Sequence, residues 1–341
     1  MRPTVHDIAE AAGVSLATVD RVLNRRPGVR QSTIGRVEEA IARIGYVRDL
    51  AAANLAKRRI YPLVFILPEG PNAFMRALEA AVLEAKTRSA IERTDIRLLT
   101  IPPFDAQALA QALDTLDLSE LAGVALVATE AGAVREGVAR LHDAGVPVVT
   151  LVSDLPNSRR DHYVGIDNVA AGRTAASLLG RFVGNCRGKI AVVAGSMLVR
   201  DHVERRMGFD QVMHAEFPAL DVLPVLEGLD DGATVARVLA GCLEAHPDVV
   251  GVYSLGAGNR GMIEVLEARG VGRAISVVAH ELSDHARKAL TSGTIDAVIN
   301  QDAGHEVRSA IRVMKARADG LPPVDDQERI RIDIFLRDNL P

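Results

Sequence analysis

Apolar side chains recur at helical spacing in three short stretches of the first 45 residues, at positions 5–12, 16–23 and 32–44. This spacing predicts three amphipathic helices, each with one buried face. Thr4 and Asp7 have the spacing of a capping box, and Gly13 predicts a tight turn after the first helix. Three short helices with a glycine turn between the first two are typical of a helix-turn-helix module, whose second helix enters the major groove of DNA.

The charge is distributed unevenly along the chain. Residues 1–60 contain eleven Lys or Arg and six Asp or Glu, a net charge of +5, whereas the whole chain has a formal net charge of −4. The remaining 281 residues therefore have a net charge of −9. Because a basic surface attracts phosphates and an acidic one repels them, we interpret the first 60 residues as the DNA-binding part.

After Ile60 the pattern changes to continuous apolar runs that alternate with amphipathic stretches. The runs are LVFIL (63–67), IRLL (96–99), VALV (124–127), VPVVTL (146–151), IAVV (190–193), VVGVY (249–253), ISVV (275–278) and AVI (297–299). Such runs, separated by helices of about 10–15 residues, indicate βαβ units in buried parallel sheets. About 280 residues exceed what one hydrophobic core usually holds, so we expect two Rossmann-like α/β lobes.

The head has a specific order of residues: TVHDIAEAAGVSLATVDRVLN stands at 4–24, RVEEAI at 36–41 and IGY at 44–46. These segments resemble the head of LacI-family transcriptional regulators. The resemblance implies a DNA-binding set in which Leu16, Ala17 and Arg21 contact base edges and Ser15, Thr18 and Asn24 contact phosphates, with Thr4 as a further member. Asp20 departs from the family's usual serine, and a carboxylate beside DNA phosphates is unfavourable.

An alanine-rich segment, VRDLAAANLAKRR, follows at 47–59. Asp49 predicts the start of a helix that is too short to be stable alone in water. The family resemblance implies a hinge helix that orders on DNA, paired with that of a dimer mate, with Leu55 wedged into a minor-groove base step. The alternative is an ordinary helical linker with Leu55 packed on the body, and the basic residues 57–59 favour the wedge.

The order of strands and helices after Ile60 resembles the type-I periplasmic sugar-binding fold. We therefore expect a helix-turn-helix domain at 1–47, a hinge helix and linker at 48–60, and an effector-binding domain at 61–341. The expected N-lobe comprises about 61–164 and 302–322, and the C-lobe about 165–301 and 323–341. The chain would then cross between the lobes near Gly165, Gln301 and Val324.

Polar side chains follow the C-terminal ends of the expected strands, where ligands bind in open α/β sheets. Asn72 has the groups to hydrogen-bond hydroxyls, and Phe74 is the leading residue for stacking on a sugar ring, because aromatic residues make up only 3% of the chain and Trp is absent. Asp154 and Asp167 follow two further strands. Each of these residues also has an ordinary alternative role as a helix cap or surface pair.

Further candidates come from the resemblance. Arg205, three residues before Gly208-Phe209, matches the family's sugar-binding arginine, Glu281 its strand-end aspartate with one carbon more, and Gln301 its crossover glutamine. The full expected effector-binding set is Asn72, Phe74, Asp154, Asp167, Arg205, Asn259, Glu281 and Gln301. A carboxylate that accepts hydroxyls, with Arg and Asn donating, is a usual means of holding a neutral polyol.

A different class of function is suggested by GAGNRG at 256–261, with Glu281 about twenty residues on. This spacing has the form of a dinucleotide-binding fingerprint, so an NAD-binding oxidoreductase-like domain is the alternative hypothesis. Against it, the motif lies late in the chain, behind a DNA-binding head. The spacing of His280 and His285 does not suit a shared metal on one helix, so we expect no enzyme, no cofactor and no metal.

The composition sets the remaining expectations. The composition leads us to expect no signal peptide. The sequence contains no apolar run of 18 residues, and its two cysteines are too few for a disulfide framework. We expect a cytoplasmic, nucleoid-associated protein without membrane contact. Because the C-terminus carries no apolar heptads that could assemble tetramers, we expect a homodimer. We expect this dimer to be a repressor that binds double-stranded operator DNA and a sugar or polyol effector.

Overall fold

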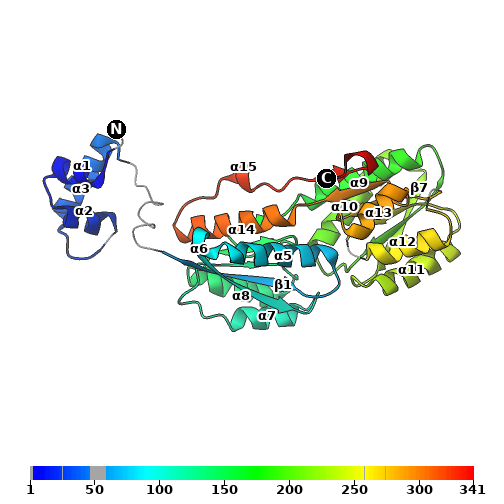
Figure 1. Cartoon of the computed structure of the whole chain (residues 1–341), viewed down its shortest axis with the longest axis horizontal. Coiled ribbons are helices and arrows are strands. Elements are labelled where there is room, and N and C mark those ends of the chain that lie inside the picture. The colour runs from blue at the N-terminus through cyan, green and yellow to red at the C-terminus, as the bar shows by residue number, and fades with distance from the viewer. Residues whose placement is uncertain (1–2, 25, 47–58, 257, 273) are drawn as a thin grey trace. The chain divides into compact units, whose positions relative to one another are not determined.

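The computed structural model describes residues 3–24, 26–46, 59–256, 258–272 and 274–341 (Figure 1). They divide into two compact units, Met1–Arg59 and Ile60–Pro341. The first is helical, and the second contains two lobes built on largely parallel sheets. The predicted fold class is therefore confirmed. None of the described helices combines the length and apolarity that crossing a bilayer requires.

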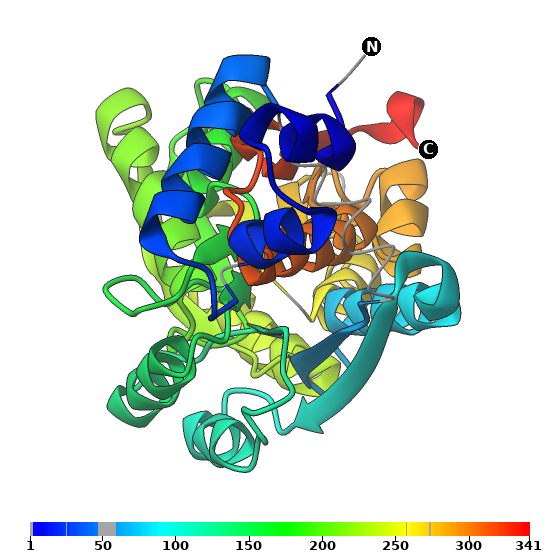
Figure 2. The same ribbon diagram turned by 90° about the vertical axis from the view of Figure 1, so that its left-hand side faces the viewer.

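The first unit consists of α1 (Val5–Ala12), α2 (Leu16–Leu23) and α3 (Gln31–Ile44), the blue helices of Figure 2. The amide of Asp7 donates to the Thr4 hydroxyl at 3.5 Å, and the amide of Thr4 donates to the Asp7 carboxylate at 2.7 Å, which completes the capping box. Gly13 ends α1 with a φ of 63°, a conformation that glycine adopts without strain. Each helix adds fully buried side chains to one small core, which contains Ile8, Val19 and Val37.

The N-lobe is built on a five-stranded parallel sheet in the order β2-β1-β3-β4-β5. Its strands are β1 (Tyr61–Pro68), β2 (Thr94–Ile101), β3 (Gly123–Leu126), β4 (Val148–Leu151) and β5 (His162–Val164). Its helices are α5 (Ala73–Thr87), α6 (Ser89–Glu92), α7 (Ala106–Asp114), α8 (Gly132–Asp143) and α14 (Ala303–Ala318). Leu63 and Phe65 share a core with α5 and α14, whereas Val64 and Ile66 share one with α7 and α8. Helices thus cover both faces of the sheet, as its continuous apolar strands require.

The C-lobe is built on a six-stranded sheet in the order β11-β10-β9-β8-β6-β7. Its strands are β6 (Gly188–Ala194), β7 (Leu220–Glu227), β8 (Val249–Ser254), β9 (Ser276–His280), β10 (Ala297–Asn300) and the antiparallel β11 (Asp333–Phe335). Its helices are α9 (Asn168–Val183), α10 (Arg200–Glu216), α11 (Gly232–Ala245), α12 (Asn259–Ala268) and α13 (Asp284–Ser292). The short turn η1 (Arg337–Asn339) follows β11. Helices α9 and α10 share a core with one face of the sheet, and α11, α12 and α13 share one with the other.

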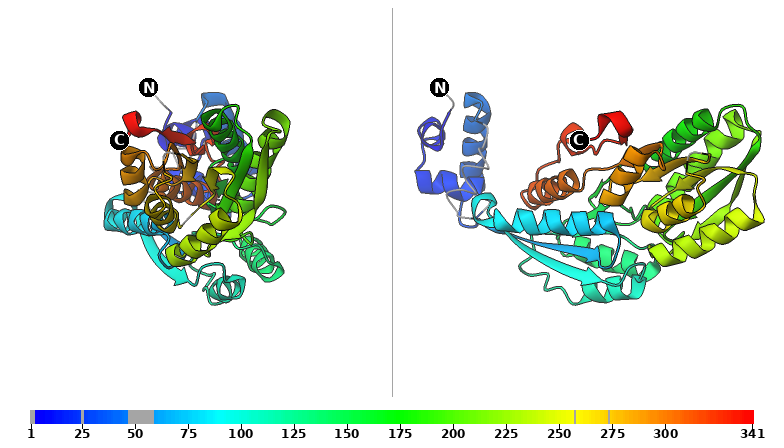
Figure 3. Two further views of the ribbon diagram at one scale, coloured as in Figure 1. Left: turned by 90° about the vertical axis from the view of Figure 1, so that its right-hand side faces the viewer. Right: turned by 45° about the vertical axis from the view of Figure 1, so that its right-hand side comes forward.

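The chain passes between the lobes three times, which Figure 3 shows from two sides. The first two crossings join β5 to α9 and β10 to α14. The third follows α15 (Asp325–Glu328), because Glu328 pairs with Arg312 of α14 at 2.7 Å before β11 joins the C-lobe sheet. This crossing therefore lies between Glu328 and Asp333, a few residues beyond the expected position near Val324.

Helices α9 and α10 pack backbone to backbone. A β-carbon on Gly172 would lie 1.9 Å from the carbonyl oxygen of Arg205, and one on Gly208 would lie 2.1 Å from that of Val169. Only glycine permits this approach at either position, so two glycines set the distance between the helices. The same contact fixes where the side chain of Arg205 begins.

We expect Gly208→Ala to lower the free energy of unfolding by about 1–3 kcal/mol, because the new methyl group would force α9 and α10 apart. Gly241→Ala on α11 is the matched control, since nothing lies within 4 Å of the added carbon. That change should be neutral or stabilising by up to ~1 kcal/mol. Urea unfolding followed by circular dichroism compares the two variants, and equal midpoints would contradict the proposed role of Gly208.

Candidate functional site

The exposed face of α2 is formed by Leu16, Ala17, Asp20 and Arg21, which occupy neighbouring positions on a helix. Val19 points the opposite way into the core of the first unit. Leu16 is 42% exposed, an unusual position for a large apolar side chain on so small a unit. This combination of an outward leucine and an outward arginine suits a helix that is covered when DNA binds.

The phosphate-contact candidates lie at helix ends. The amide of Thr18 donates to the Ser15 hydroxyl at 3.2 Å, so Ser15 caps α2 as Thr4 caps α1. Helix N-termini with exposed amides and hydroxyls are common phosphate-binding positions. Leu55, the expected minor-groove wedge, lies outside the described residues.

The structure gives Asp20 local partners. The side-chain amide of Asn24 donates to Asp20 Oδ1 at 2.6 Å, and Arg26 Nη1 lies 3.3 Å from Asp20 Oδ2. The Arg26 guanidinium offsets the carboxylate's charge within the same unit. The bond to Asp20 also occupies the side-chain amide of Asn24, the residue that was expected to contact a phosphate.

A cavity of about 450 Å³ lies between the two lobes of the second unit. The N-lobe contributes the segment at the start of α5, and the C-lobe contributes the ends of β8 and β9 and the loop before α11. The lining residues include Asn72, Phe74, Asp230, Asn259 and Glu281. Four of the expected effector-binding residues therefore meet in one cavity.

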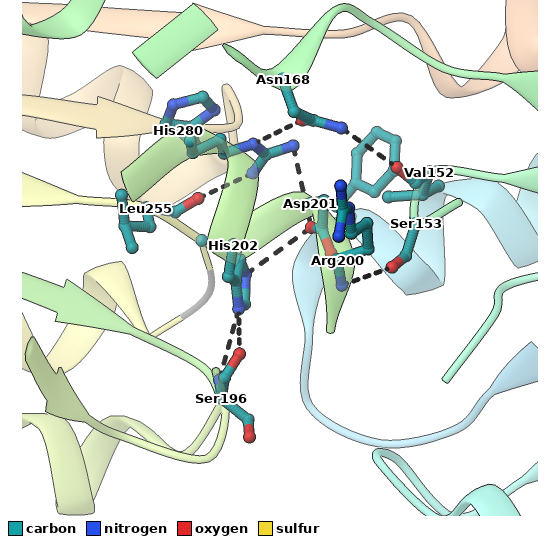
Figure 4. A network of polar contacts seen from close by, with 12 residues as sticks. Val152, Ser153, Asn168, Ser196, Arg200, Asp201, His202, Leu255 and His280 are labelled. Carbon is teal, nitrogen blue, oxygen red and sulfur yellow. Dashed lines mark hydrogen bonds and ion pairs between the residues drawn. The ribbon is translucent and has the colours of Figure 1, made fainter. Parts of the chain in front are cut away.

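Two of the hydrogen bonds that connect the lobes involve Asn72 and Ser153. Asn72 Nδ2 donates to Asp230 Oδ2 at 2.7 Å, while Asn72 Oδ1 accepts from the amide of Phe74 and caps α5. The amide of Arg200 donates to the Ser153 hydroxyl at 3.0 Å (Figure 4). Because both bonds join opposite lobes, they are made only when the lobes lie close together.

Arg205 is fully buried on α10, and it does not itself line the cavity but interacts with the charge of Glu281. Its Nε donates to Asn168 Oδ1 at 2.8 Å, and its Nη1 donates to the carbonyl oxygen of Leu255 at 2.7 Å. Its Nη2 has no hydrogen-bond partner and lies 3.9 Å from Asp201 Oδ2. Figure 4 shows Asn168, Leu255 and Asp201 around this guanidinium. A buried cation with an unused N–H donor is suited to bind a ligand oxygen.

Glu281 stands at the end of β9 with a φ of 69°, a strained conformation for a residue that is not glycine. Gln301 Nε2 donates to its Oε1 at 2.8 Å, and its buried Oε2 has no partner. Burial raises the pKa of the Glu281 carboxyl from 4.5 to about 7. The side-chain amide oxygen of Gln301, Oε1, is also buried and has no hydrogen-bond partner. Unpaired polar atoms of this kind are costly unless a ligand or water pairs with them.

The other candidates differ in where they lie. Phe74 lines the cavity but is only 7% exposed and packs mainly into the N-lobe core. Asn259 lines the cavity, and its amide donates to the carbonyl oxygen of His280. Asp154 pairs with Arg160, and Asp167 caps α9, and neither belongs to the lining of this cavity.

The structure adds three buried acids that sequence reasoning missed: Asp201, Asp230 and Glu306. Asp230 follows β7, so the strand-end rule would have found it had that strand been recognised. Both carboxylate oxygens of Glu306 are buried without a partner on α14, and burial and the charge of Glu281 raise its pKa well above the usual range. No local signal in the sequence marks a glutamate in an amphipathic helix as buried.

The glycine motif of residues 256–261 serves packing within the chain. A β-carbon on Gly256 would lie 2.3 Å from His202 Nε2, and one on Gly261 would lie 1.8 Å from the carbonyl oxygen of Gly232. These contacts explain both glycines without a pyrophosphate. Among the described residues, no group of three or more His, Cys, Asp or Glu is arranged to hold a metal ion.

Two family models match the chain. The one described as "Bacterial regulatory proteins, lacI family" matches residues 4–49, and the one described as "Periplasmic binding protein domain" matches residues 63–322. The second spans well over half of the chain. Both resemblances inferred from the sequence are thereby confirmed.

Individual proteins extend these matches. The chain is 26% identical over 336 residues to the HTH-type transcriptional regulator CelR of Thermobifida fusca, which covers 94% of this chain and 93% of that protein. GanP, a glucose-galactose binding protein from Geobacillus stearothermophilus, superposes with a TM-score of 0.74 at 21% identity and covers 83% of this chain and 99% of its own. A solute-binding protein of Burkholderia graminis in complex with D-arabinose gives 0.74 at 22% identity, covering 83% and 97%. At these identities the two solved structures establish the fold alone.

Burial of Glu281 predicts a specific pH dependence of stability. Since its pKa is about 7 in the folded chain and 4.5 in the reference state, the folded form retains a proton that the unfolded form loses, and stability falls as pH rises from 4.5 to 7. We expect Glu281→Gln to raise the free energy of unfolding at pH 8 by on the order of 1–3 kcal/mol and to have little effect at pH 4.

Melting temperatures at both pH values test this expectation. Glu216→Gln, which alters an exposed glutamate of α10, is the control and should have little effect at either pH. A Glu281→Gln effect of equal size at pH 4 and pH 8 would show that the carboxylate's charge is not the cause.

Proposed function

This chain belongs to the LacI family of bacterial regulatory proteins, and we propose that it is a repressor whose affinity for operator DNA is controlled by a sugar or related polyol bound between its lobes. That it is a DNA-binding transcriptional regulator with a sugar-binding-like sensor domain, and not an enzyme, follows from the family. Our proposal concerns three further points: the role as a repressor, the chemical class of the effector and assembly as a homodimer. We further propose that it acts in the cytoplasm, where operator DNA lies.

One observation supports the effector site above the others: Glu281 lines a cavity between the two lobes with one carboxylate oxygen unpaired, and the buried Arg205, whose Nη2 is also unpaired, lies close enough to interact with its charge. Arg205 Nη2 would donate to a hydroxyl, and Glu281 Oε2 and Gln301 Oε1 would accept from others. A polyol provides both kinds of group. The D-arabinose bound by the Burkholderia protein of the same fold supports this class of ligand.

The lobe-bridging bonds suggest how binding reaches the DNA. An effector that contacts both walls of the cavity would favour the closed arrangement held by Asn72 and Asp230. In a homodimer, a change in lobe angle alters the spacing of the two heads, and with it their fit to two half-sites. We propose that residues 48–60, with Leu55 as the minor-groove wedge, transmit this change.

We expect Arg21→Ala to weaken specific DNA binding by about 1–3 kcal/mol if the guanidinium makes a bidentate base contact. Arg36→Ala, at an exposed position of α3, is the matched control and should affect affinity far less. Fluorescence anisotropy at one fixed salt concentration, with an operator selected from a random duplex library, measures both variants. Equal affinities for the two variants would rule out base reading by Arg21.

The coupling can be tested before the effector is known. Asn72→Asp keeps the oxygen that caps α5 but places a second carboxylate against Asp230, so it should open the cleft, whereas Asn72→Ser removes only the cross-lobe bond. We expect Asn72→Asp to change operator affinity five-fold or more, by roughly 1–3 kcal/mol, and Asn72→Ser to lie between it and wild type. X-ray scattering should show a larger radius of gyration for Asn72→Asp if its lobes open. If the lobes open and operator affinity nevertheless equals that of wild type, lobe closure does not control DNA binding.

A further inference from the structure

The cleft region contains more unpaired acceptors than unpaired donors. Among the described residues, three buried side-chain acceptor atoms there lack a partner: Asp230 Oδ1, Glu281 Oε2 and Gln301 Oε1. Both oxygens of Glu306 also lack a partner, but its raised pKa leaves this carboxyl protonated and neutral. The one unpaired cationic donor is Arg205 Nη2, and His280 Nδ1 is the remaining ring nitrogen. A neutral hydroxyl both donates and accepts, so a ligand made of hydroxyls alone does not match this imbalance well.

The charges are unbalanced in the same direction. Among the described residues, Arg205 is the one buried arginine. Asp201, the half-buried Glu281 and Glu306 lie close enough to interact with its charge, and Asp230 interacts in turn with Asp201. Burial and the charge of Arg205 lower the pKa of His280 well below its usual range, so its imidazole is neutral. The arginines at the mouth of the cavity have other partners: Arg260 pairs with Glu264, and Arg76 donates to the carbonyl oxygen of Pro71.

Neutral amides hold the two acids that line the cavity. Asn72 donates to one oxygen of Asp230, and Gln301 donates to one oxygen of Glu281, and the second oxygen of each acid is unpaired. An amide fixes a carboxylate's position without cancelling its charge. Asp230 is only 8% exposed, and no side chain of the described residues pairs with the second oxygen of either acid. Glu306 lies close enough to Glu281 for the charge of Glu281 to raise its pKa, so Glu281 carries the negative charge and Glu306 is neutral.

We propose, on the basis of the proposed function, that the effector is a polyol that carries a protonated amine, such as an amino sugar, and that Glu281 holds its ammonium group. The ammonium supplies three donors and one positive charge, which are what the cavity lacks. Hydroxyls of the same ligand pair with Arg205 and Gln301. Removing a buried charge partner that has no substitute weakens binding strongly, so this contact would set specificity for the amine.

Matched sugars test the proposal on the full chain. The probes are D-glucosamine, D-galactosamine and D-mannosamine, each compared with its parent hexose, and N-acetyl-D-glucosamine, which retains the nitrogen without its charge. Calorimetry at pH 7 and constant ionic strength gives the affinities. We expect at least one hexosamine to bind ten-fold or more tightly than its parent hexose, and the N-acetyl compound to lose that advantage.

The variants locate the contact. Glu281→Gln should reduce the preference for the hexosamine at least ten-fold, while Glu216→Gln, which is exposed on α10 outside the cavity, should preserve it. Circular dichroism confirms that both variants fold. Glu306→Gln, which replaces a carboxyl that its raised pKa keeps neutral, should leave the preference nearly unchanged.

Two results would overturn the proposal. If the hexoses bind as tightly as the hexosamines, the sensor is one for neutral polyols, and the proposed function stands without the amine. If none of the seven sugars binds, the amino-sugar assignment is wrong, and the Asn72 variants decide separately whether the cleft controls operator binding.

Discussion

The sensor unit depends on how a single buried guanidinium is held. Arg205 is positioned from behind by the contact of α9 with α10, where glycine alone fits, and from the side by Asn168 and the Leu255 carbonyl. Two of its nitrogens are thereby occupied by neutral oxygens, and its charge is shared among several carboxylates. Such an arrangement gives specificity rather than stability, because burying charged groups costs about as much as their attraction returns.

The structure of the head follows closely from its sequence because its signals are local. Thr4 and Ser15 cap their helices as the capping rules predict, and Gly13 adopts the left-handed conformation that its position implies. The third helix, α3, differs from the first two because it begins at Gln31, after Arg30, with no side-chain cap. Packing of Val37 and Ala40 into the small core, rather than a cap, determines where this helix lies.

In the sensor unit, buried strands were predictable and the edge strand β7 was not. Of its eight residues only Leu220 is buried, and Pro224 interrupts its apolar run. A proline is tolerated at the edge of a sheet because no neighbouring strand requires its N–H. Missing β7 concealed Asp230, the acid that bridges the lobes. Glu306 was unpredictable for a different reason: its burial results from where α14 packs, which no local sequence pattern records. The residues inferred by resemblance lie near one another: Gln301 donates to Glu281, and Arg205 interacts with the charge of Glu281. In contrast, Asp154 pairs with Arg160, and Asp167 caps α9.

The position of the third crossing has a mechanical consequence. Ser309 and Arg312 of α14 donate hydrogen bonds to Glu328. These bonds hold the chain on the N-lobe as far as Glu328, so only the few residues before β11 connect the lobes at this crossing. All three connections between the lobes are therefore only a few residues long. Such a joint permits rotation about one axis and resists sliding or twisting. Closure of the lobes is then the single motion that the sensor can transmit. Any ligand that stabilises the closed lobes therefore produces the same output, whatever its chemistry.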